Sequence, residues 1–264
     1  MNPTRFQAEL LKCLQDHIAA LQTPDKEWVI KGFIDIYQNV YAISLDTKVI
    51  SKIIEILLFP VISDFAKEHH LEMILAKEQN YYPDISFRDA TDNTLIALDI
   101  KSTYRQNERR VNGFTLGAFT GYFRDRQSTK NITFKYEDYT AHFVLGVIYT
   151  RNEAPELERQ KYTIAEMDKI LSVISDIEFI VQEKFRIASA RPGSGNTKNI
   201  GSVTDIEALR NGSGPFSAQG VEIFDDYWRY YRTRDMGDVA YSNLAEYCRY
   251  KKIQPSEPIQ EDDE

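Results

Sequence analysis

The sequence has few of the residues on which several protein classes depend. It holds 2 cysteines and 4 histidines, which excludes a disulfide framework and gives no pattern of zinc ligands. No apolar run approaches the ~20 residues of a membrane-spanning helix. The first residues lead into an amphipathic pattern and not into the apolar core of a signal peptide, so we expect a cytoplasmic protein without membrane contact.

Positive charge is also in short supply, since the formal net charge is −8. This balance argues against a nonspecific coat on nucleic acid. The tail, residues 254–264, holds five acids and no base, and we expect it to be disordered. Bases gather instead between residues 101 and 135. Such a surface can hold DNA with an affinity that falls steeply with salt, although a solvated face is the simpler interpretation.

Apolar periodicity outlines the main elements. It predicts helices over residues 6–21 and from Thr47 through Phe59, with Pro60 either ending the second helix or starting a further turn. Residues 28–43 predict one or two strands, and residues 141–150 form the clearest buried strand.

The stretch from Tyr82 to Lys101 carries the strongest chemical signal. Asp84 follows a proline and opens one apolar run, whereas Asp99 and Lys101 end another. Residues 88–94 have the composition of a turn, so the two runs predict a hairpin. Strand alternation places Asp99 and Lys101 on one face, and pairing brings Asp84 beside Asp99.

Two carboxylates beside an ammonium suit a hard divalent cation bound to a phosphate. The alternative is structural, because Asp after Pro and Asp-X-Lys at a strand end are both common. Glu55, on the predicted helix, is a third acid of interest. Its bland interpretation is a surface pair with Lys52, one helical turn earlier. The sequence offers no Ser/His/Asp or Cys/His arrangement, so we expect no protein nucleophile.

Residues 191–201 form the other distinctive stretch. Three glycines and several hydrogen-bonding side chains predict that it is not a regular element. Glycine allows a ligand to approach the backbone closely, and asparagine can bond an adenine edge in both directions. A flexible linker is the alternative.

Together these stretches resemble the EcoRV family of blunt-cutting type II restriction endonucleases, within the PD-(D/E)XK nucleases. The motif stands here as Pro83-Asp84 and Asp99-Ile100-Lys101. Further matching segments follow in the same order between Ser44 and Arg229. They are Asp46–Val49 with Glu55, Gln79–Asp84, Phe114–Gly117, Thr129–Ile132, Gly193–Thr197 with Asn199–Ser202, and Asp226–Arg229.

The resemblance implies a restriction-endonuclease-like α/β fold, with a central mixed β-sheet flanked by helices. Residues 1–253 would form a single nuclease domain with an N-terminal dimerisation part and a C-terminal DNA-binding part. It implies a homodimer on a short palindromic duplex, GATATC or a variant, cut to blunt ends with Mg²⁺ or Mn²⁺ as a substitute. A restriction-modification context implies functional association with a cognate DNA methyltransferase.

The resemblance also implies residue roles. Asp84 and Asp99 would bind Mg²⁺ together with Ile100, and Glu55 would be an auxiliary ligand. Lys101 would stabilise the phosphorane or help to position the attacking water. The residues expected to contact DNA are Thr47, Lys48, Glu78, Gln79, Asn80, Ser102, Thr103, Tyr104, Lys130, Gly193, Ser194, Gly195, Asn196, Thr197, Lys198, Asn199 and Arg229.

Three residues depart from the family pattern. Glu78 replaces a glutamine, Lys198 a threonine of the recognition loop, and Ser102 a threonine after the motif lysine. Two other classes remain open at this point: a repair nuclease with the same core, and a DNA-binding protein that does not cut. An acidic scaffold without a nucleic-acid role is a third.

Overall fold

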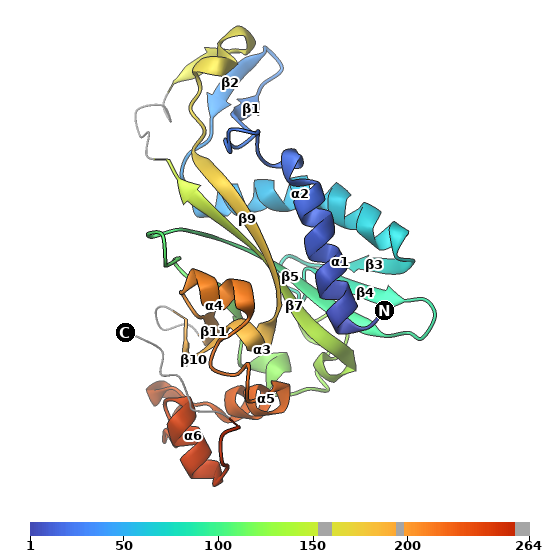
Figure 1. Ribbon diagram of the computed structural model, residues 1–264, viewed down its shortest axis with the longest axis vertical. Helices are drawn as coiled ribbons and strands as arrows, with labels where there is room; N and C mark the ends of the chain where they lie inside the picture. The colour runs from blue at the N-terminus through green and yellow to red at the C-terminus, as the bar shows by residue number, and fades with distance from the viewer. Residues whose placement is uncertain (153–159, 194–197, 257–264) are drawn as a thin grey trace.

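A five-stranded mixed sheet forms the centre of the computed structural model, which describes residues 1–152, 160–193 and 198–256 (Figure 1). Its order is β3-β4-β5-β7-β9, with β5 and β7 parallel and the other neighbours antiparallel. The strands are β3 (Leu71–Leu75), β4 (Ile85–Asp89), β5 (Leu95–Tyr104), β7 (Tyr139–Arg151) and β9 (Ile174–Glu183). Helices flank the sheet, so the predicted fold class is confirmed.

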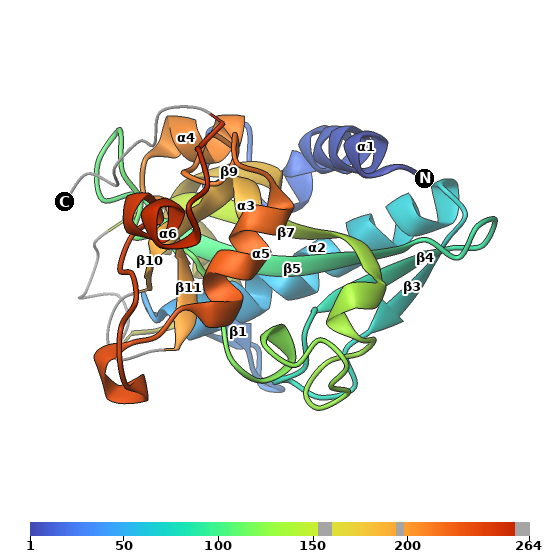
Figure 2. The same cartoon turned by 90° about the horizontal axis from the view of Figure 1, so that it is seen from below.

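Strand alternation divides the buried residues between the two faces of this sheet. Phe143 of β7 and Leu98 of β5 join one core with α1 and α2, whereas Val144 and Ala97 join an opposite core with the C-terminal elements. Figure 2 shows α1 and α5 on opposite sides of β7. Because Asp99 alternates with Leu98, it faces the C-terminal side.

The N-terminal helices agree in part with their prediction. Asn2 caps α1, which ends at Asp16, earlier than predicted, and a short 3₁₀ helix then covers Ile18–Ala20. The Asp46 side chain caps α2 by accepting hydrogen bonds from the main-chain amides of Lys48 and Val49. The helix α2 continues through Pro60 without a break. The α-helices are α1 (Pro3–Asp16), α2 (Thr47–Glu68), α3 (Lys184–Ile187), α4 (Ile206–Asn211), α5 (Val221–Tyr230) and α6 (Leu244–Lys251).

Two small sheets stand apart from the central one. The first has the order β1-β2-β8, so residues 28–43 do contain a hairpin. It lies at one end of the long axis of the molecule, and α6 lies at the other (Figure 1). Its strands are β1 (Gly32–Ile34), β2 (Asn39–Ala42) and β8 (Lys161–Thr163), followed by a 3₁₀ helix over Ile164–Lys169.

The second small sheet corrects the expectation for residues 191–201. Its order is β10-β11-β6, with β6 at Thr115–Ala118, β10 at Ala188–Pro192 and β11 at Asn199–Ser202. The stretch predicted to be irregular therefore includes the end of one strand and most of another. One of the two strands that pair with β11 is β6, which lies about eighty residues earlier in the chain and which local composition cannot indicate.

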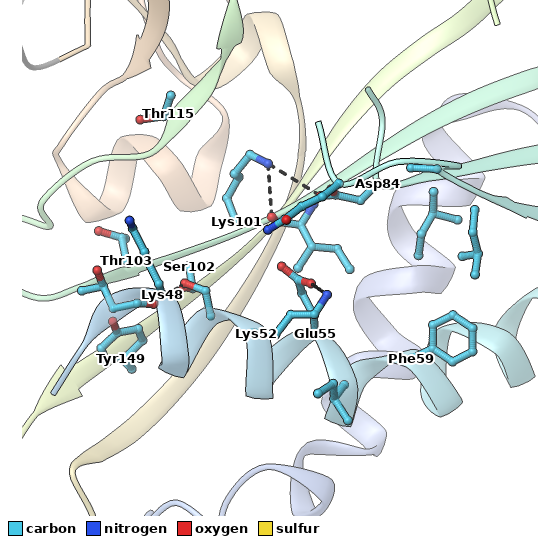
Figure 3. A pocket seen from close by; sticks show the side chains of 18 of the residues that line it. Lys48, Lys52, Glu55, Phe59, Asp84, Lys101, Ser102, Thr103, Thr115 and Tyr149 are labelled. Carbon is cyan, nitrogen blue, oxygen red and sulfur yellow. Dashed lines mark hydrogen bonds and ion pairs between the residues drawn. The ribbon is translucent and has the colours of Figure 1, made fainter. Parts of the chain in front are cut away.

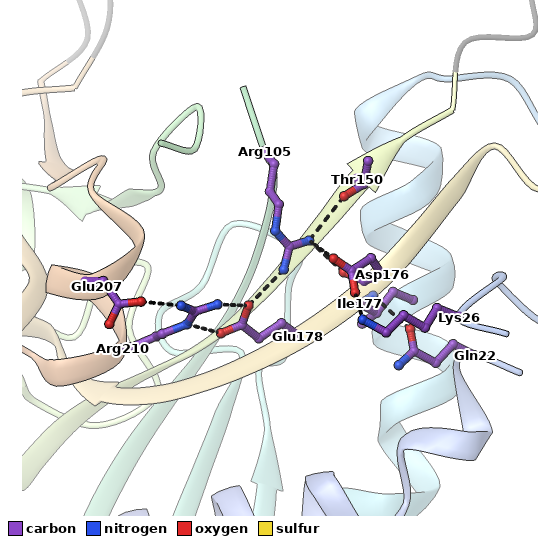
Figure 4. Close-up of polar contacts among 9 residues, drawn as sticks. All are labelled: Gln22, Lys26, Arg105, Thr150, Asp176, Ile177, Glu178, Glu207 and Arg210. Atoms are coloured by element: carbon purple, nitrogen blue, oxygen red, sulfur yellow. Dashed lines mark hydrogen bonds and ion pairs between the residues drawn. The ribbon is translucent and has the colours of Figure 1, made fainter. Parts of the chain in front are cut away.

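Arg105, directly after β5, ties this end of the sheet to β9 (Figure 4). Its Nη2 donates to Glu178 Oε2 at 2.8 Å, and its Nη1 donates to the carbonyl of Asp176 at 2.6 Å. Arg210 of α4 donates to both carboxylate oxygens of Glu178, at 2.5 and 2.8 Å. Glu178 thereby joins three elements.

No helix in the described part of the chain combines the length and apolar character needed to cross a bilayer.

Candidate active site

The hairpin of β4 and β5 aligns the two motif carboxylates. Ile85 pairs with Leu98 in the antiparallel register, so the next step outward sets Asp84 opposite Asp99. Directly opposed residues of an antiparallel pair project from the same face. The predicted hairpin and the predicted neighbourhood of the two acids are thus both present.

Polar contacts tie the two carboxylates to Lys101 and Ile100, and Figure 3 shows the group around Asp84 and Lys101. The main-chain amide of Ile100 donates to Asp84 Oδ2 at 2.7 Å. Lys101 Nζ lies 2.8 Å from Asp99 Oδ2 and 3.6 Å from Asp84 Oδ2. The same ammonium donates to the Ile100 carbonyl at 3.3 Å. Asp99 is only 4% exposed, so its charge depends on these partners.

The electrostatics of the site reflect two acids held around one base. Burial, with the nearby charge of Asp99, raises the pKa of Asp84 to about 7. Burial alone would raise the pKa of Asp99, but the ammonium groups of Lys101 and Lys184 outweigh it and lower that pKa. Burial opposes the charge of Lys101, yet Asp99 and Asp84 together raise its pKa. Of the two acids, Asp84 is therefore the one that takes up a proton as the pH falls below about 7.

A cleft of about 1170 Å³ opens beside this group, between α2 and the ends of β4 and β5 (Figure 3). It brings together eleven of the residues predicted from the sequence. They are Thr47, Lys48, Glu55, Glu78, Gln79, Asp84, Ile100, Lys101, Ser102, Thr103 and Tyr104. Thr103 is buried, whereas Thr47, Lys48, Glu78 and Gln79 are exposed.

Glu55 lines this cleft but pairs with its neighbour on the helix. Lys52 Nζ lies 2.7 Å from Glu55 Oε2, which is the surface pair that the sequence offered as the alternative. Within the described residues, no three Asp, Glu, His or Cys side chains are grouped closely enough to hold a metal ion. The acids positioned together are therefore Asp84 and Asp99, and the role of Glu55 as a ligand stays a prediction.

Other predicted DNA contacts lie outside the cleft. Asn80, Lys130 and Arg229 are exposed. Gly193 follows β10, and Asn199 begins β11. The predicted residues Ser194, Gly195, Asn196 and Thr197 fall outside the described part of the chain.

Lys198 has a partner that the sequence did not suggest. Its Nζ lies 3.7 Å from Asp235 Oδ2, in a 3₁₀ helix over Arg234–Met236. Both side chains are largely exposed, so this ion pair contributes little stability. The ammonium can therefore exchange Asp235 for another anion.

Two further residues escaped the sequence analysis. Ser51 Oγ lies 2.7 Å from Ser102 Oγ and joins α2 to β5 across the cleft. Lys184 is buried near Asp99, with its Nζ 4.0 Å from the centre of the Tyr82 ring. Neither contact leaves a local signal, because each partner is distant in sequence. The nearest hint for Lys184 is its position at the end of an apolar strand.

Comparison with known proteins covers both the cleft and the second small sheet. Residues 24–252 match the family described as "Restriction endonuclease EcoRV". The type II restriction enzyme EcoRV of Escherichia coli is 35% identical over 235 residues. That alignment covers 88% of this chain and 94% of the relative.

Proposed function

We propose that this chain, which belongs to the EcoRV family of type II restriction endonucleases, hydrolyses one phosphodiester bond in each strand of a short palindromic DNA site. The observation that carries the proposal is the grouping of Asp84, Asp99 and Lys101 beside an open cleft. Family membership supports a sequence-specific DNA endonuclease, and this grouping indicates where the reaction takes place.

The donor set at this position fits Mg²⁺, with Mn²⁺ as a substitute. Hard divalent cations prefer carboxylate and carbonyl oxygens, which Asp84, Asp99 and the main chain of Ile100 can supply. When bound, the ion would offset charge on the scissile phosphate and lower the pKa of a water. Glu55 lies on the same cleft and is our candidate for an auxiliary ligand.

Lys101 changes partners in this proposal. In the absence of a cation, its ammonium offsets the charge of both carboxylates. Once a cation binds these acids, the ammonium becomes available to phosphate oxygens, on which charge accumulates during attack. Water is the nucleophile, since the sequence offers no activated Ser or Cys.

The cleft also supports a path for the DNA backbone. Thr47 and Lys48 stand exposed at the N-terminus of α2, where the Lys48 ammonium and the positive end of the helix dipole favour a phosphate. Ser102, Thr103 and Tyr104 extend the opposite wall. Lys130 and Arg229 are exposed and are proposed as further phosphate contacts.

Base reading is assigned to two segments. Residues 78–80, which are exposed, are proposed to face the minor groove, and residues 193–199, which connect β10 to β11 in the sequence, are proposed to face the major groove. The target is GATATC or a variant, because Glu78 and Lys198 change the chemistry of both segments. A nuclease of this kind requires protection of the host sites, so we also propose a cognate DNA methyltransferase.

An exposed apolar patch on the β1-β2-β8 sheet supports a homodimer. Its most exposed members are Ile36 and Tyr37, at 88% and 79%. The patch, named here the N-terminal patch, comprises Phe33, Ile34, Ile36, Tyr37, Tyr41, Ile164, Met167 and Leu171. Exposed apolar side chains gathered on and beside one small sheet are typical of a protein contact, and a second copy of this chain would complete a two-fold palindrome reader.

Plasmid digestion with sequenced ends tests the proposal. With Mg²⁺, the wild-type protein should produce blunt ends at a short palindrome, and Asp99→Ala should abolish cutting. Uncut DNA with retained site binding in Mg²⁺ would instead identify a non-cleaving DNA-binding protein. Cutting without sequence preference would favour a repair nuclease, and equal cutting by Asp99→Ala would move the active site elsewhere.

A further inference from the structure

Lys184 occupies an unusual position for a lysine. It is 2% exposed and begins α3, between the edge strand β9 and strand β10. A buried ammonium is unfavourable unless neighbouring groups compensate for the loss of water. The groups around Lys184 should therefore show which interactions stabilise its buried ammonium.

An aromatic ring lies against this ammonium, and a nearby carboxylate acts on it through its charge. Nζ lies 4.0 Å from the centre of the Tyr82 ring, a cation–π contact shielded from water. A methyl group built on Gly117 of β6 would lie 3.9 Å from the same nitrogen, so the main chain packs closely there. Asp99 is the main acid whose charge acts on Lys184.

Tyr82 is itself fixed from several sides. Its hydroxyl lies 2.8 Å from His142 Nδ1, and its ring stacks on that of Tyr122, with centroids 5.3 Å apart. Tyr82 precedes Asp84 by two residues, so the fixed ring restricts the position of the main chain that carries the Asp84 carboxylate.

The contact between Lys184 and Tyr82 joins two parts of the proposed enzyme. Lys184 leads through one turn of helix into β10, which pairs with β11. Tyr82 leads into Asp84 and the β4–β5 hairpin. The contact between Lys184 and Tyr82 therefore connects the β10–β11 pair directly to the segment that carries Asp84.

We propose that Lys184 is a positioning residue that links the base-reading hairpin to the carboxylates through the Tyr82 ring. This inference rests on the proposed function. It requires that loss of the Lys184 contact lowers the rate of cleavage more than it lowers the affinity for DNA. The residue touches neither DNA nor the reacting atoms in this scheme.

Lys184→Met tests the link, with Lys12→Met as a matched control on the exposed face of α1. Methionine keeps the length and burial but removes the charge. Single-turnover cleavage at saturating enzyme with Mg²⁺ should slow by about tenfold or more. Affinity for the same site with Ca²⁺ should stay within about threefold of wild type, a split that a purely structural role would not produce.

A site that differs by one base pair provides the second readout. The base-reading hairpin does not make its full set of contacts with such a site. Lys184→Met should therefore slow cleavage of that site less than cleavage of the cognate site. Equal slowing on both sites would overturn the link, and so would an unchanged rate on the cognate site. A loss confined to DNA affinity would make Lys184 a binding contact instead.

A second pair of variants covers the case in which Lys184→Met does not fold. Tyr82→Leu removes the ring beneath the ammonium, whereas Tyr82→Phe keeps it, so the leucine variant should cut more slowly. If Lys184→Met and Tyr82→Leu both fail to fold, the contact serves the fold alone and the proposal is overturned. If the wild-type protein does not cut DNA, the proposed function is refuted. If wild type and Lys184→Met cut at the same rate, only the role of Lys184 is refuted, so the two failures are distinguishable.

Discussion

The main-chain amide of Ile100 donates to Oδ2 of Asp84 across 2.7 Å, so the strand that carries Asp99 also orients the acid of the neighbouring strand. Asp99 and Lys101 lie on β5, and Asp84 directly precedes β4, so all three stand on or beside paired strands. Groups placed on paired strands keep their geometry better than groups placed on loops. This arrangement has consequences for stability as well as for cutting.

Asp84→Asn should stabilise the metal-free protein while it abolishes function. Burial and the charge of Asp99 raise the pKa of Asp84 to about 7, so above that pH the folded protein carries an ionised Asp84 at a cost in stability relative to the unfolded chain. The melting temperature in EDTA should rise at pH 8 and change less at pH 5, where wild-type Asp84 already carries a proton. Cleavage with Mg²⁺ should fall on the order of 10³-fold. A lower melting temperature at pH 8 would contradict this account.

Glu55→Gln tests the auxiliary role of the third acid. Because Glu55 pairs with Lys52 and does not join the carboxylates, its removal should slow cleavage by only about tenfold, far less than Asp99→Asn. Lys52→Met is the matched control, since it breaks the same ion pair but leaves the acid. Equal losses in the two variants would show that the pair, and not the acid, matters. Single-turnover rates across a Mg²⁺ titration provide the comparison.

Asn196→Ala should change specificity at one base pair. A lost bidentate contact to a base edge costs ~1–3 kcal/mol at that position and leaves others unaffected. Competitive binding with Ca²⁺ to a panel of single-base variants measures this effect. A uniform loss on every duplex would make Asn196 a backbone contact.

Ile36→Lys should disrupt the proposed homodimer. Ile36 is the most exposed member of the N-terminal patch, and a charge there would oppose burial against a second copy. Sedimentation should show a monomer, and plasmid DNA should be nicked in preference to being cut on both strands. Val239→Lys, an exposed apolar residue near the other end of the chain, should stay dimeric. A dimeric Ile36→Lys protein would place the interface elsewhere.

Glu178 should contribute stability that depends on pH. Burial opposes its charge, but Arg210 and Arg105 outweigh burial and lower its pKa. A lowered carboxyl pKa stabilises the fold above the unfolded value of ~4.3, and this contribution is lost as the pH falls through the folded pKa. Glu178→Gln should therefore unfold more readily in urea at pH 7, by about 1–3 kcal/mol, and this difference should shrink below about pH 4.

Glu207→Gln is the control for that measurement. Glu207 also pairs with Arg210, but its side chain is 69% exposed. Exposed ion pairs contribute about 0–1 kcal/mol, so this variant should stay close to wild type at both pH values. A loss as large as that of Glu178→Gln would contradict the importance of burial.

Local chemistry made much of the site predictable. The turn composition of residues 88–94 and the alternation around Asp99 are enough to specify a hairpin that aligns Asp84 with Asp99. The i,i+3 spacing of Lys52 and Glu55 likewise made their ion pair a natural alternative to a metal ligand. Each of these predictions depends on residues close together in the chain.

Pairing between distant segments was not predictable in the same way. Three glycines and several hydrogen-bonding side chains argued against strands at residues 191–201, but β11 pairs with β6 and with β10. Strand propensity depends on the neighbour that a strand finds, and here one neighbour comes from much earlier in the chain. The bond between Lys198 and Asp235 was hidden for the same reason.

The sequence by itself determined the family, the two acids, the lysine and the hairpin that presents them, because motif spacing and alternation are local properties. Only the tertiary structure decided that Ile100 orients Asp84, that Glu55 stays with Lys52, and that Lys184 lies buried against Tyr82. The physical reason is that burial and compensation of charge depend on which distant elements pack together. These contacts between distant elements influence which side chains of the site carry a charge, and the motif alone does not specify this.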